Sequence, residues 1–257
     1  MNSKFKNVVI FGASQGIGKA LAFKYAQHGC HLILLSRNES SLKEIAEKIN
    51  LSGGKCFYRK CDVTIKGDVN AGIEFALNSL GNIDLAIINS GLGGPNWMDE
   101  FSSEEFIKSF EVNTFGIAHA LEILIPIMKK QGSGTIAGVT SMADIRGYGG
   151  SSSYSASKSA ASILLEAARV ELKKGNIRVI TVRPGFVKTA MTDMNEFKMP
   201  FLMQPDKAAK KIFTGIEKGR SVVQFPWPIV MATRIIKIIP NWIYDWGMNL
   251  VRPKKKK

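Results

Sequence analysis

Short apolar runs alternate with longer segments in which apolar residues recur every three or four positions. The runs that predict buried strands are 6–11, 31–36, 55–60, 83–88, 135–140, 177–182 and 221–224. The segments that predict helices are 19–28, 42–51, 65–80, 101–130, 152–174 and 206–218, with an interruption or bend expected near Pro126. Strands that alternate with helices form parallel sheets. The pattern therefore predicts an α/β fold in a single domain, with a doubly wound parallel sheet of about seven strands and helices on both faces.

A glycine-rich turn follows the first predicted strand. Gly12, Gly16 and Gly18 are spaced G-x-x-x-G-x-G, and a helical pattern begins directly after them. Residues without side chains permit a tight turn and let backbone N–H groups approach a pyrophosphate at the helix N-terminus. A strand, a glycine turn and a helix in this order open a dinucleotide-binding unit of the Rossmann type.

The end of the second predicted strand bears on the choice of dinucleotide. Units that bind NAD place an Asp or Glu about 20 residues past the glycines, where it holds the ribose 2′-hydroxyl. Here the strand ends in Ser36, Arg37 and Asn38. Because a guanidinium pairs well with phosphate oxygens, Arg37 favours NADP(H) over NAD(H). Ser14 and Asn38 are candidates for additional hydrogen bonds.

Tyr154 and Lys158 lie near the start of the helix predicted at 152–174. Residues four apart share one helical face. The unperturbed pKa of tyrosine is about 10, and a neighbouring ammonium lowers it by stabilising the phenolate. We expect the pair to act as an acid/base group near neutral pH. For this motif alone, a surface Tyr and Lys that share a face are the alternative.

Together these features resemble the short-chain dehydrogenase/reductase family over about residues 6–189. The resemblance also rests on Asp62, on Asn89-Ser90-Gly91, on Asn113, on Ser141 and on Pro184-Gly185. Two positions depart from the family pattern. Phe11 stands where a Thr is frequent, and Ile88-Asn89-Ser90-Gly91 replaces the usual Asn-Asn-Ala-Gly. Both departures affect the loops rather than the reacting groups.

The resemblance implies a role for each of four catalytic residues. Tyr154 would donate a proton to a carbonyl oxygen as hydride arrives from the nicotinamide, and Ser141 would hydrogen-bond to that oxygen. Lys158 would lower the pKa of Tyr154 and bind the nicotinamide ribose. Asn113 would hold a water in a proton relay that reaches Lys158.

The resemblance also implies a set of cofactor contacts. Asp62 and Val63 resemble the adenine contacts, Asn89 and Gly91 the adenosine-side loop, and residues 184–189 the nicotinamide and pyrophosphate contacts. The residues expected to contact the cofactor are Gly12, Ser14, Gln15, Gly16, Ile17, Gly18, Arg37, Asn38, Asp62, Val63, Asn89, Gly91, Tyr154, Lys158, Pro184, Gly185, Val187 and Thr189. We expect no metal site.

Charge and cysteine content limit the classes of protein to which this sequence can belong. The formal net charge is +14, and residues 229–257 contribute seven Lys or Arg against one Asp. Much of the excess therefore belongs to the C-terminal tail. The 3 cysteines have no C-x-x-C spacing, so they predict neither a disulfide framework nor a zinc site and fit a reducing compartment. We see no signal-peptide pattern and no apolar run of about 18 residues, and we expect no transmembrane helix.

Two further segments bear on the substrate and on the location of the protein. The region 186–204, where the family generally carries a substrate lid, is rich in Met and Phe. This predicts a long or bulky apolar substrate, unless these residues only pack the loop onto the body. The catalytic domain is expected at 1–225. The extension 226–257, with an apolar helix at 229–239, aromatics and terminal lysines, fits association with an anionic membrane. An oligomer interface or a flap over the site is the alternative.

The sequence thus predicts an NADPH-dependent oxidoreductase that reduces a ketone or aldehyde to an alcohol, or catalyses the reverse, on an apolar and, by analogy, lipid-linked substrate. The alternatives are a non-catalytic NADP(H)-binding sensor or scaffold and a basic nucleic-acid-binding protein. No nucleic-acid motif is apparent, and we expect no such partner. Relatives usually pair through the helices at 101–130 and 152–174, which predicts a homodimer or homotetramer. We expect a cytoplasmic location, at the membrane face if the tail binds lipid. In a eukaryotic source the terminal lysines would resemble an endoplasmic-reticulum retrieval signal.

Overall fold

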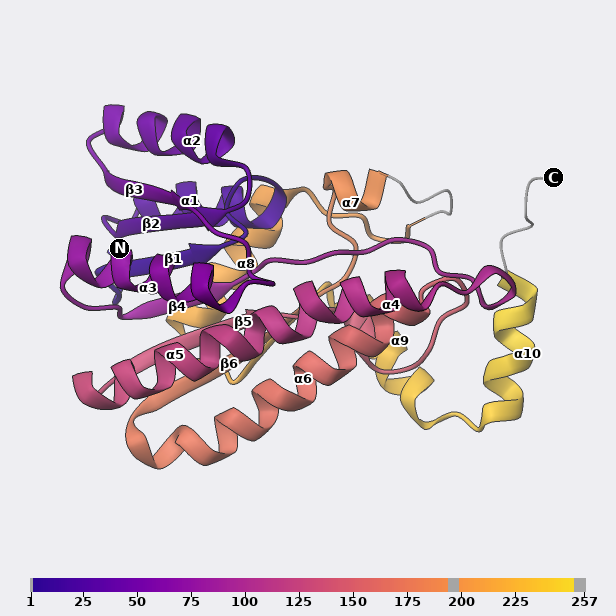
Figure 1. The fold of residues 1–257 in the computed structure, drawn as a ribbon. Coiled ribbons are helices and arrows are strands. Elements are labelled where there is room, and N and C mark those ends of the chain that lie inside the picture. Colours follow the sequence, from indigo (N-terminus) through magenta and orange to yellow (C-terminus); the bar gives the residue numbers. More distant parts are fainter. Residues whose placement is uncertain (1, 194–198, 252–257) are drawn as a thin grey trace.

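A parallel sheet forms the centre of the molecule. The computed structural model describes residues 2–193 and 199–251. In them, a 7-stranded sheet runs in the order β3-β2-β1-β4-β5-β6-β7 with all neighbours parallel (Figure 1). The strands are β1 (Asn7–Phe11), β2 (His31–Ser36), β3 (Lys55–Lys60), β4 (Leu85–Ile88), β5 (Gly134–Val139), β6 (Ile177–Pro184) and β7 (Val222–Phe225). The predicted α/β doubly wound sheet is confirmed.

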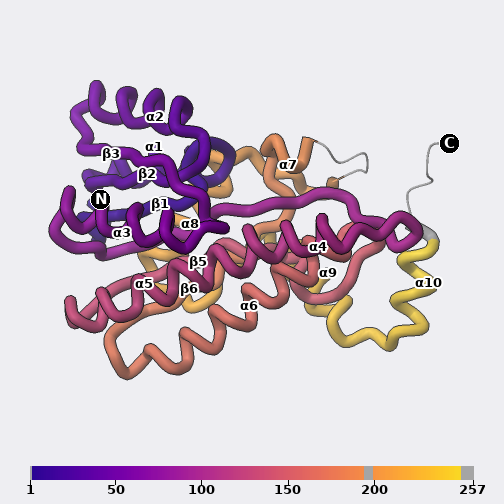
Figure 2. Tube along the Cα trace, in the orientation of Figure 1, coloured from indigo at the N-terminus to yellow at the C-terminus, as the bar shows by residue number. Residues whose placement is uncertain are grey.

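Helices cover both faces of this sheet, so the central strands are buried and rich in Val, Ile and Leu. The helices are α1 (Gly16–Ala26), α2 (Glu39–Leu51), α3 (Lys66–Leu80), α4 (Ser103–Phe110), α5 (Gly116–Gln131), α6 (Ser152–Leu172), α7 (Ala190–Asp193), α8 (Pro205–Glu217), α9 (Trp227–Ile238) and α10 (Asn241–Val251). On one face α1, α2 and α8 share a core that includes Leu21 and Ile212. On the other, α3, α5 and α6 share a core that includes Ile73 and Leu165, and these three helices lie in front of the sheet in Figure 2.

The strand order creates a switch point beside β1. That strand pairs with β2 on one side and with β4 on the other, so the chain winds away from it in both directions. At such a point a crevice opens outside the carboxyl ends of the strands, where ligands bind in open α/β sheets. The segments after β1, β2, β4, β5 and β6 all leave the sheet at this edge, and most of the predicted site residues lie in them.

Most element boundaries lie within three residues of those predicted from the pattern, and β2 and β3 coincide with the prediction. The first helix begins at Gly16 rather than at Lys19, because the last glycines of the turn already form its first turn. The prediction missed α10.

The helical segment predicted at 101–130 is divided, and not where it was expected. After α4, residues Glu111–Phe115 form a π-helical turn, and α5 then continues through Pro126 to Gln131. The interruption therefore lies around Asn113 rather than near Pro126. Asn113 is completely buried and bonds to groups outside the helix, which holds the wide turn in place. Such turns frequently mark functional sites.

One helical stretch, Ser103–Gln131, is long and apolar enough to span a membrane by length and composition. It includes α5, which buries Ile117, Leu121 and Leu124 in the core shared with α3 and α6. In the part of the chain that the structure describes, this stretch is a layer of the fold.

Candidate functional site

The glycine turn packs closely against the loop that follows β4. Gly12 has a φ of +71°, and a Cβ on it would lie 2.7 Å from the backbone nitrogen of Ser90. A Cβ on Gly18 would lie 2.7 Å from Nδ2 of Asn89. Asn89 Nδ2 in turn donates to the Gly12 carbonyl at 3.0 Å. Two of the predicted cofactor segments therefore meet, and any side chain at these glycines would fill the space between them.

The same turn faces the loop that follows β6. Gly16 has a φ of +54°, and a Cβ on it would lie 2.8 Å from Cγ2 of Thr189. Ser14 is half-buried, Gln15 is the exposed N-cap of α1 without a side-chain cap bond, and Ile17, on α1, packs against the core. The backbone N–H groups at the start of α1 thus point into a glycine-lined cradle, a geometry that fits a pyrophosphate.

The remaining predicted cofactor contacts, at the end of β6 and just after it, lie beside this cradle. Pro184 is the last residue of β6, and Gly185 donates its N–H to the Phe225 carbonyl at 2.8 Å. Val187 is buried and its carbonyl accepts a hydrogen bond from Thr192 at 2.9 Å. These contacts fix the start of the lid segment to the sheet.

Arg37 and Asp62 meet at the ends of β2 and β3. Arg37 Nη1 lies 3.9 Å from Asp62 Oδ2, and the Arg37 side chain is 68% exposed. Asp62 Oδ1 also accepts hydrogen bonds from Thr64 at 2.9 and 3.0 Å. The guanidinium is therefore accessible to an anion. The Asn38 side chain accepts from Ser41 N at 3.0 Å and caps α2, so its oxygen is already engaged.

Val63, the other predicted adenine contact, is anchored on α5. It is buried, and its carbonyl lies 3.0 Å from His119 Nδ1. A Cβ on Gly116 would lie 2.9 Å from Cγ2 of Val63. The start of α5 therefore fixes the segment after β3.

Ser141, Tyr154 and Lys158 come together where β5 ends and α6 begins. Ser141 is 9% exposed, lies two residues past the end of β5, and is close enough to Tyr154 for its hydroxyl to act on the pKa of the phenol. Lys158 Nζ lies 5.9 Å from the centre of the Tyr154 ring and donates to the Val139 carbonyl at 3.0 Å. A hydroxyl, a phenol and an ammonium group thus line one small region.

Asn113 joins this region from the π-helical turn. Its Nδ2 donates to the Leu92 carbonyl at 2.8 Å and to Ser157 Oγ at 3.0 Å, and its Oδ1 accepts from Leu92 N at 2.9 Å. A Cβ on Gly91 would lie 3.4 Å from Lys158 Nζ and 3.5 Å from Asn113 Oδ1. The loop after β4 therefore lies directly against the ammonium group, and the contact predicted between Gly91 and the cofactor stays a prediction.

The pKa values at this centre differ from the sequence prediction. Burial raises the pKa of Tyr154; the hydrogen bond with Ser141 opposes this shift and the charge of Asp144 adds to it. Burial lowers the pKa of Lys158 to about 8, against the opposing effect of Asp144. The expected lowering of the Tyr154 pKa is therefore wrong for this structure. Desolvation is the largest cause, and the Lys158 ammonium donates to the Val139 carbonyl.

Asp144 is a site residue that sequence reasoning missed. Its buried carboxylate pairs with Arg183 and accepts a hydrogen bond from Ser162, while its carbonyl accepts from Ser159 at 2.6 Å. The charge of Asp144 acts on the pKa of both Tyr154 and Lys158. Because its partners lie on α6 and β6, nothing in the local sequence signals this position.

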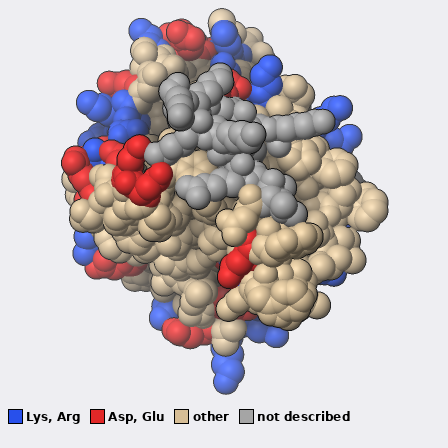
Figure 3. Space-filling model, turned by 90° about the vertical axis from the view of Figure 1, so that its right-hand side faces the viewer, with Lys and Arg blue, Asp and Glu red and all other residues tan. Residues whose placement is uncertain are grey.

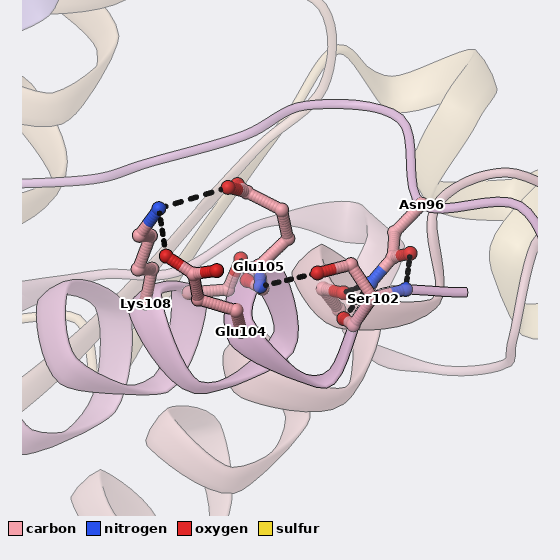
Figure 4. Close-up of polar contacts among 7 residues, drawn as sticks. Asn96, Ser102, Glu104, Glu105 and Lys108 are labelled. Carbon is pink, nitrogen blue, oxygen red and sulfur yellow. Dashed lines mark hydrogen bonds and ion pairs between the residues drawn. The ribbon is translucent and has the colours of Figure 1, made fainter. Parts of the chain in front are cut away.

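Asn96 is a second missed residue, and it fastens the loop between β4 and α4 to the start of α6. Its Nδ2 donates to Ser153 Oγ at 2.7 Å and to the Ser102 carbonyl at 2.9 Å, and its Oδ1 accepts from Ser102 N at 2.9 Å. Figure 4 shows Asn96 and Ser102 facing each other, with Ser102 capping α4 through Glu105 N. Because Tyr154 follows Ser153, this loop forms a wall of the site.

The first part of the predicted lid lies beside the site. A Cβ on Gly93 would lie 2.9 Å from Sδ of Met191 and 3.3 Å from Cδ2 of Tyr154. Met191, on α7, and the Tyr154 ring therefore both lie beside Gly93. Two apolar residues expected in the lid, Met194 and Phe197, lie outside the described residues. Met203 N donates to the Phe186 carbonyl at 3.0 Å, which joins the two ends of the lid segment.

Comparisons with known proteins agree with this geometry. Residues 6–199 match the family model of the short chain dehydrogenases. An uncharacterized oxidoreductase of Myxococcus xanthus (strain DK1622) is 33% identical over 249 residues, 96% of this chain and 98% of that protein. The 7alpha-hydroxysteroid dehydrogenase of Escherichia coli (strain K12) is 34% identical over 184 residues, 72% of either chain.

A solved structure supports the same assignment. A 7 alpha-hydroxysteroid dehydrogenase complexed with NADH and 7-oxo glycochenodeoxycholic acid superposes with a TM-score of 0.79 at 29% identity, covering 86% of this chain and 92% of that one. The family model spans most of this chain, and a relative shares a third of its residues along nearly its whole length. The protein therefore belongs to the short-chain dehydrogenase family of oxidoreductases.

Proposed function

We propose that the protein is an NADP(H)-dependent enzyme that reduces a ketone or aldehyde to an alcohol, or catalyses the reverse reaction. The convergence of Ser141, Tyr154 and Lys158 at the sheet edge that holds the glycine turn carries this proposal. The bound nicotinamide supplies or accepts the hydride. In reduction Tyr154 gives its proton to the carbonyl oxygen, and Ser141 hydrogen-bonds to that oxygen, where negative charge develops.

Burial raises the pKa of Tyr154, so the phenol is protonated at neutral pH, as a proton donor in the reductive direction must be. Donation leaves a phenolate, which the nearby Lys158 ammonium stabilises. With its pKa lowered to about 8, Lys158 exchanges protons close to neutral pH. Asn113 uses both ends of its amide on Leu92 and Ser157, so it positions the loop over Lys158. Its water-holding role stays a prediction.

Arg37 alone supports the preference for NADP(H). A similar solved enzyme carries NADH, so that comparison does not add to it. The Arg37 guanidinium is accessible at the end of β2, where a ribose 2′-phosphate would lie. Dissociation constants of NADPH and NADH should be measured for the wild type, for Arg37→Ser and for the control Lys48→Ser, an exposed lysine in the last turn of α2. We expect Arg37→Ser to weaken NADPH binding at least about tenfold and to leave NADH unchanged. Equal affinities in the wild type would refute the preference.

We propose an apolar substrate from the residues around Tyr154. Met191 and the Tyr154 ring both lie beside Gly93, and the exposed Phe201 and Leu202 lie in the second half of the lid segment. One relative is named for a hydroxysteroid, a large apolar alcohol. A rise of kcat/KM with chain length in a series of alkan-2-ones is the expected result. A flat series would remove the apolar preference without affecting the reductase.

We further propose a homo-oligomer in the cytoplasm, paired through α4, α5 and α6. Large apolar side chains are exposed on this side at Ile107, Phe115, Ile163 and Val170. Burying them between two copies would remove apolar surface from water. A monomeric mass in solution at micromolar concentration would contradict this assembly.

A further inference from the structure

The outward face of α9 is apolar and has no partner within the described residues. Trp227 is 76% exposed and Ile238 is 81% exposed, and Met231 and Ile235 are exposed between them. These four residues recur at intervals of three and four, so they lie along one face of the helix. An exposed apolar stripe of this size is unusual on a soluble protein and marks an interaction site.

The opposite face of α9 packs against the body of the protein, so the apolar stripe points to solvent. Val230 and Thr233 are buried against the body of the protein. A Cβ on Gly185 would lie 3.2 Å from Cδ1 of Ile229, so the helix begins against the loop that follows β6. At its other end Arg146 donates to the carbonyls of Ile236 at 3.1 Å and Ile239 at 2.9 Å.

The next helix, α10, continues the same arrangement. Tyr244 faces inward: its hydroxyl donates to the Gly147 carbonyl at 2.5 Å, and the Arg146 guanidinium lies 4.1 Å from the centre of its ring. Trp242 and Trp246 are four residues apart and are 74% and 67% exposed. Polar contacts thus hold α10 from the inside, and its two tryptophans point to solvent.

The apolar surface extends to the lid segment. Phe201, Leu202 and Lys207 line a shallow groove of about 460 Å³ together with Pro226, the residue before α9. Phe201 and Leu202 are themselves exposed. We call the exposed side of α9, α10 and this lid segment the C-terminal face.

Basic residues accompany the apolar ones. Lys207, Arg234 and Lys237 are exposed, as are the acidic residues Asp206, beside Lys207, and Asp245, the single acidic residue of α9 and α10. The sequence beyond α10 adds Arg252 and four consecutive lysines, 254–257. Figure 3 views the end of the molecule that carries α10: uncharged residues make up most of its lower and right-hand parts, and Lys and Arg side chains lie mainly around the edge.

We propose that the C-terminal face docks on the surface of an anionic phospholipid bilayer. Tryptophans favour the boundary between lipid and water, and an apolar helix face with flanking cations fits the interface of an anionic membrane. A second copy is a poorer occupant, because a two-fold contact through this face would bring the basic groups of both copies together.

Docking in this way would place the catalytic cleft near the lipid. The inward contacts of α9 and α10 are with the loop after Ser141, through Arg146, and with Gly185 beside the cofactor cradle. The groove at Phe201 joins the docking face to the lid. Substrate dissolved in the bilayer would therefore reach the site from the side that faces the membrane.

Partitioning of the full chain onto vesicles tests the proposal independently of turnover. The probes are sedimentable vesicles of phosphatidylcholine with phosphatidylglycerol and of phosphatidylcholine alone. We expect binding to the anionic vesicles with a blue shift of tryptophan emission, since three of the 4 tryptophans lie on this face. Trp242→Ser and Trp246→Ser should each weaken partitioning about tenfold.

Leu51→Ser is the matched control, because Leu51 is 88% exposed on α2, away from this face. It should partition as the wild type does, and NADPH binding by every variant verifies the fold. Three results would overturn the proposal. The first is no binding to anionic vesicles. The second is binding that the Trp variants leave unchanged but that is abolished when Lys254, Lys255, Lys256 and Lys257 are replaced by Ser. The third is self-association without lipid that the Trp variants remove.

Discussion

Lys158 holds an ammonium group where water hardly reaches it. Its side chain is 3% exposed and donates to the Val139 carbonyl at 3.0 Å. Burial lowers its pKa to about 8, although Asp144 opposes the shift. Such a group releases and takes up protons near neutral pH, which a proton relay needs, but its charged form destabilises the folded protein.

The buried lysine makes stability depend on pH in a defined window. Because its pKa is about 8 in the folded protein and the usual value is 10.5, the unfolded chain binds one more proton between these limits. As the pH rises through this window, the free energy of unfolding of the wild type should therefore increase relative to that of Lys158→Met, by up to about 1.4 kcal/mol per pH unit. Urea unfolding of both proteins from pH 8 to 10 measures this difference. A constant difference would contradict the lowered pKa.

Asp144 should support both stability and the protonation of Lys158. In Asp144→Asn the half-buried partners Arg183 and Ser162 lose the buried carboxylate, which should lower the free energy of unfolding by about 1–3 kcal/mol. The pKa of Lys158 should fall further, so the pH profile of kcat should move to lower pH. Urea unfolding and pH–rate profiles measure both effects.

The exposed pair of Glu166 and Arg169 provides the control for this prediction. Because exposed ion pairs contribute little, Glu166→Gln should change the free energy of unfolding by less than about 1 kcal/mol and leave the pH profile unchanged. Equal effects of Asp144→Asn and Glu166→Gln would contradict the role assigned to Asp144.

At the scale of elements, the site depends on how closely loops from different strands approach one another. The turn after β1 touches the loop after β4 at Gly12 and the loop after β6 at Gly16. The π-helical turn brings Asn113 to the same loop after β4. A single methyl group at these contacts would disturb two elements at once.

A comparison of Gly12→Ala with Gly29→Ala separates the effect of backbone strain from the effect of the close packing of the turn. Both glycines have positive φ, +71° and +77°, but a Cβ on Gly29 would meet nothing within 4 Å. Gly29→Ala should therefore lower the free energy of unfolding by about 1–2 kcal/mol, the strain alone. Gly12→Ala should cost about 1–3 kcal/mol more and abolish NADPH binding. Equal losses in the two variants would contradict the packed turn.

At the scale of the whole molecule, all three cysteines are buried, and none pairs with another. Burial raises the pKa of Cys30 to about 11 and of Cys56 and Cys61 to about 12. Their contribution to stability is complete below the ordinary thiol pKa and is lost as pH rises through 11 to 12. The folded protein should thus react slowly with a thiol reagent at pH 8, and the urea-unfolded chain should react rapidly at all three cysteines. Rapid labelling of the folded protein would contradict the burial.

How far the sequence predicted the molecule depends on the range of the interactions. Strands such as β2 and β3 follow from local apolar runs, and the glycine turn and the Tyr154–Lys158 pair follow from local spacing. Asn96 and Asp144 bond to residues 57 and 39 positions away, so no local pattern signals them. The direction of the Tyr154 pKa shift also depends on burial by distant segments, and spacing alone predicted the opposite sign.

The central claim is that Tyr154 donates the proton in an NADPH-dependent reduction. Its most direct test is NADPH oxidation with an apolar ketone by the wild type, by Tyr154→Phe and by the control Tyr58→Phe, with NADPH affinity measured for each. We predict that Tyr154→Phe lowers kcat/KM by about 10²–10⁴ while its NADPH affinity and the activity of Tyr58→Phe stay unchanged. Turnover by Tyr154→Phe within tenfold of the wild type, or wild-type protein that binds NADPH but reduces no ketone, would contradict it.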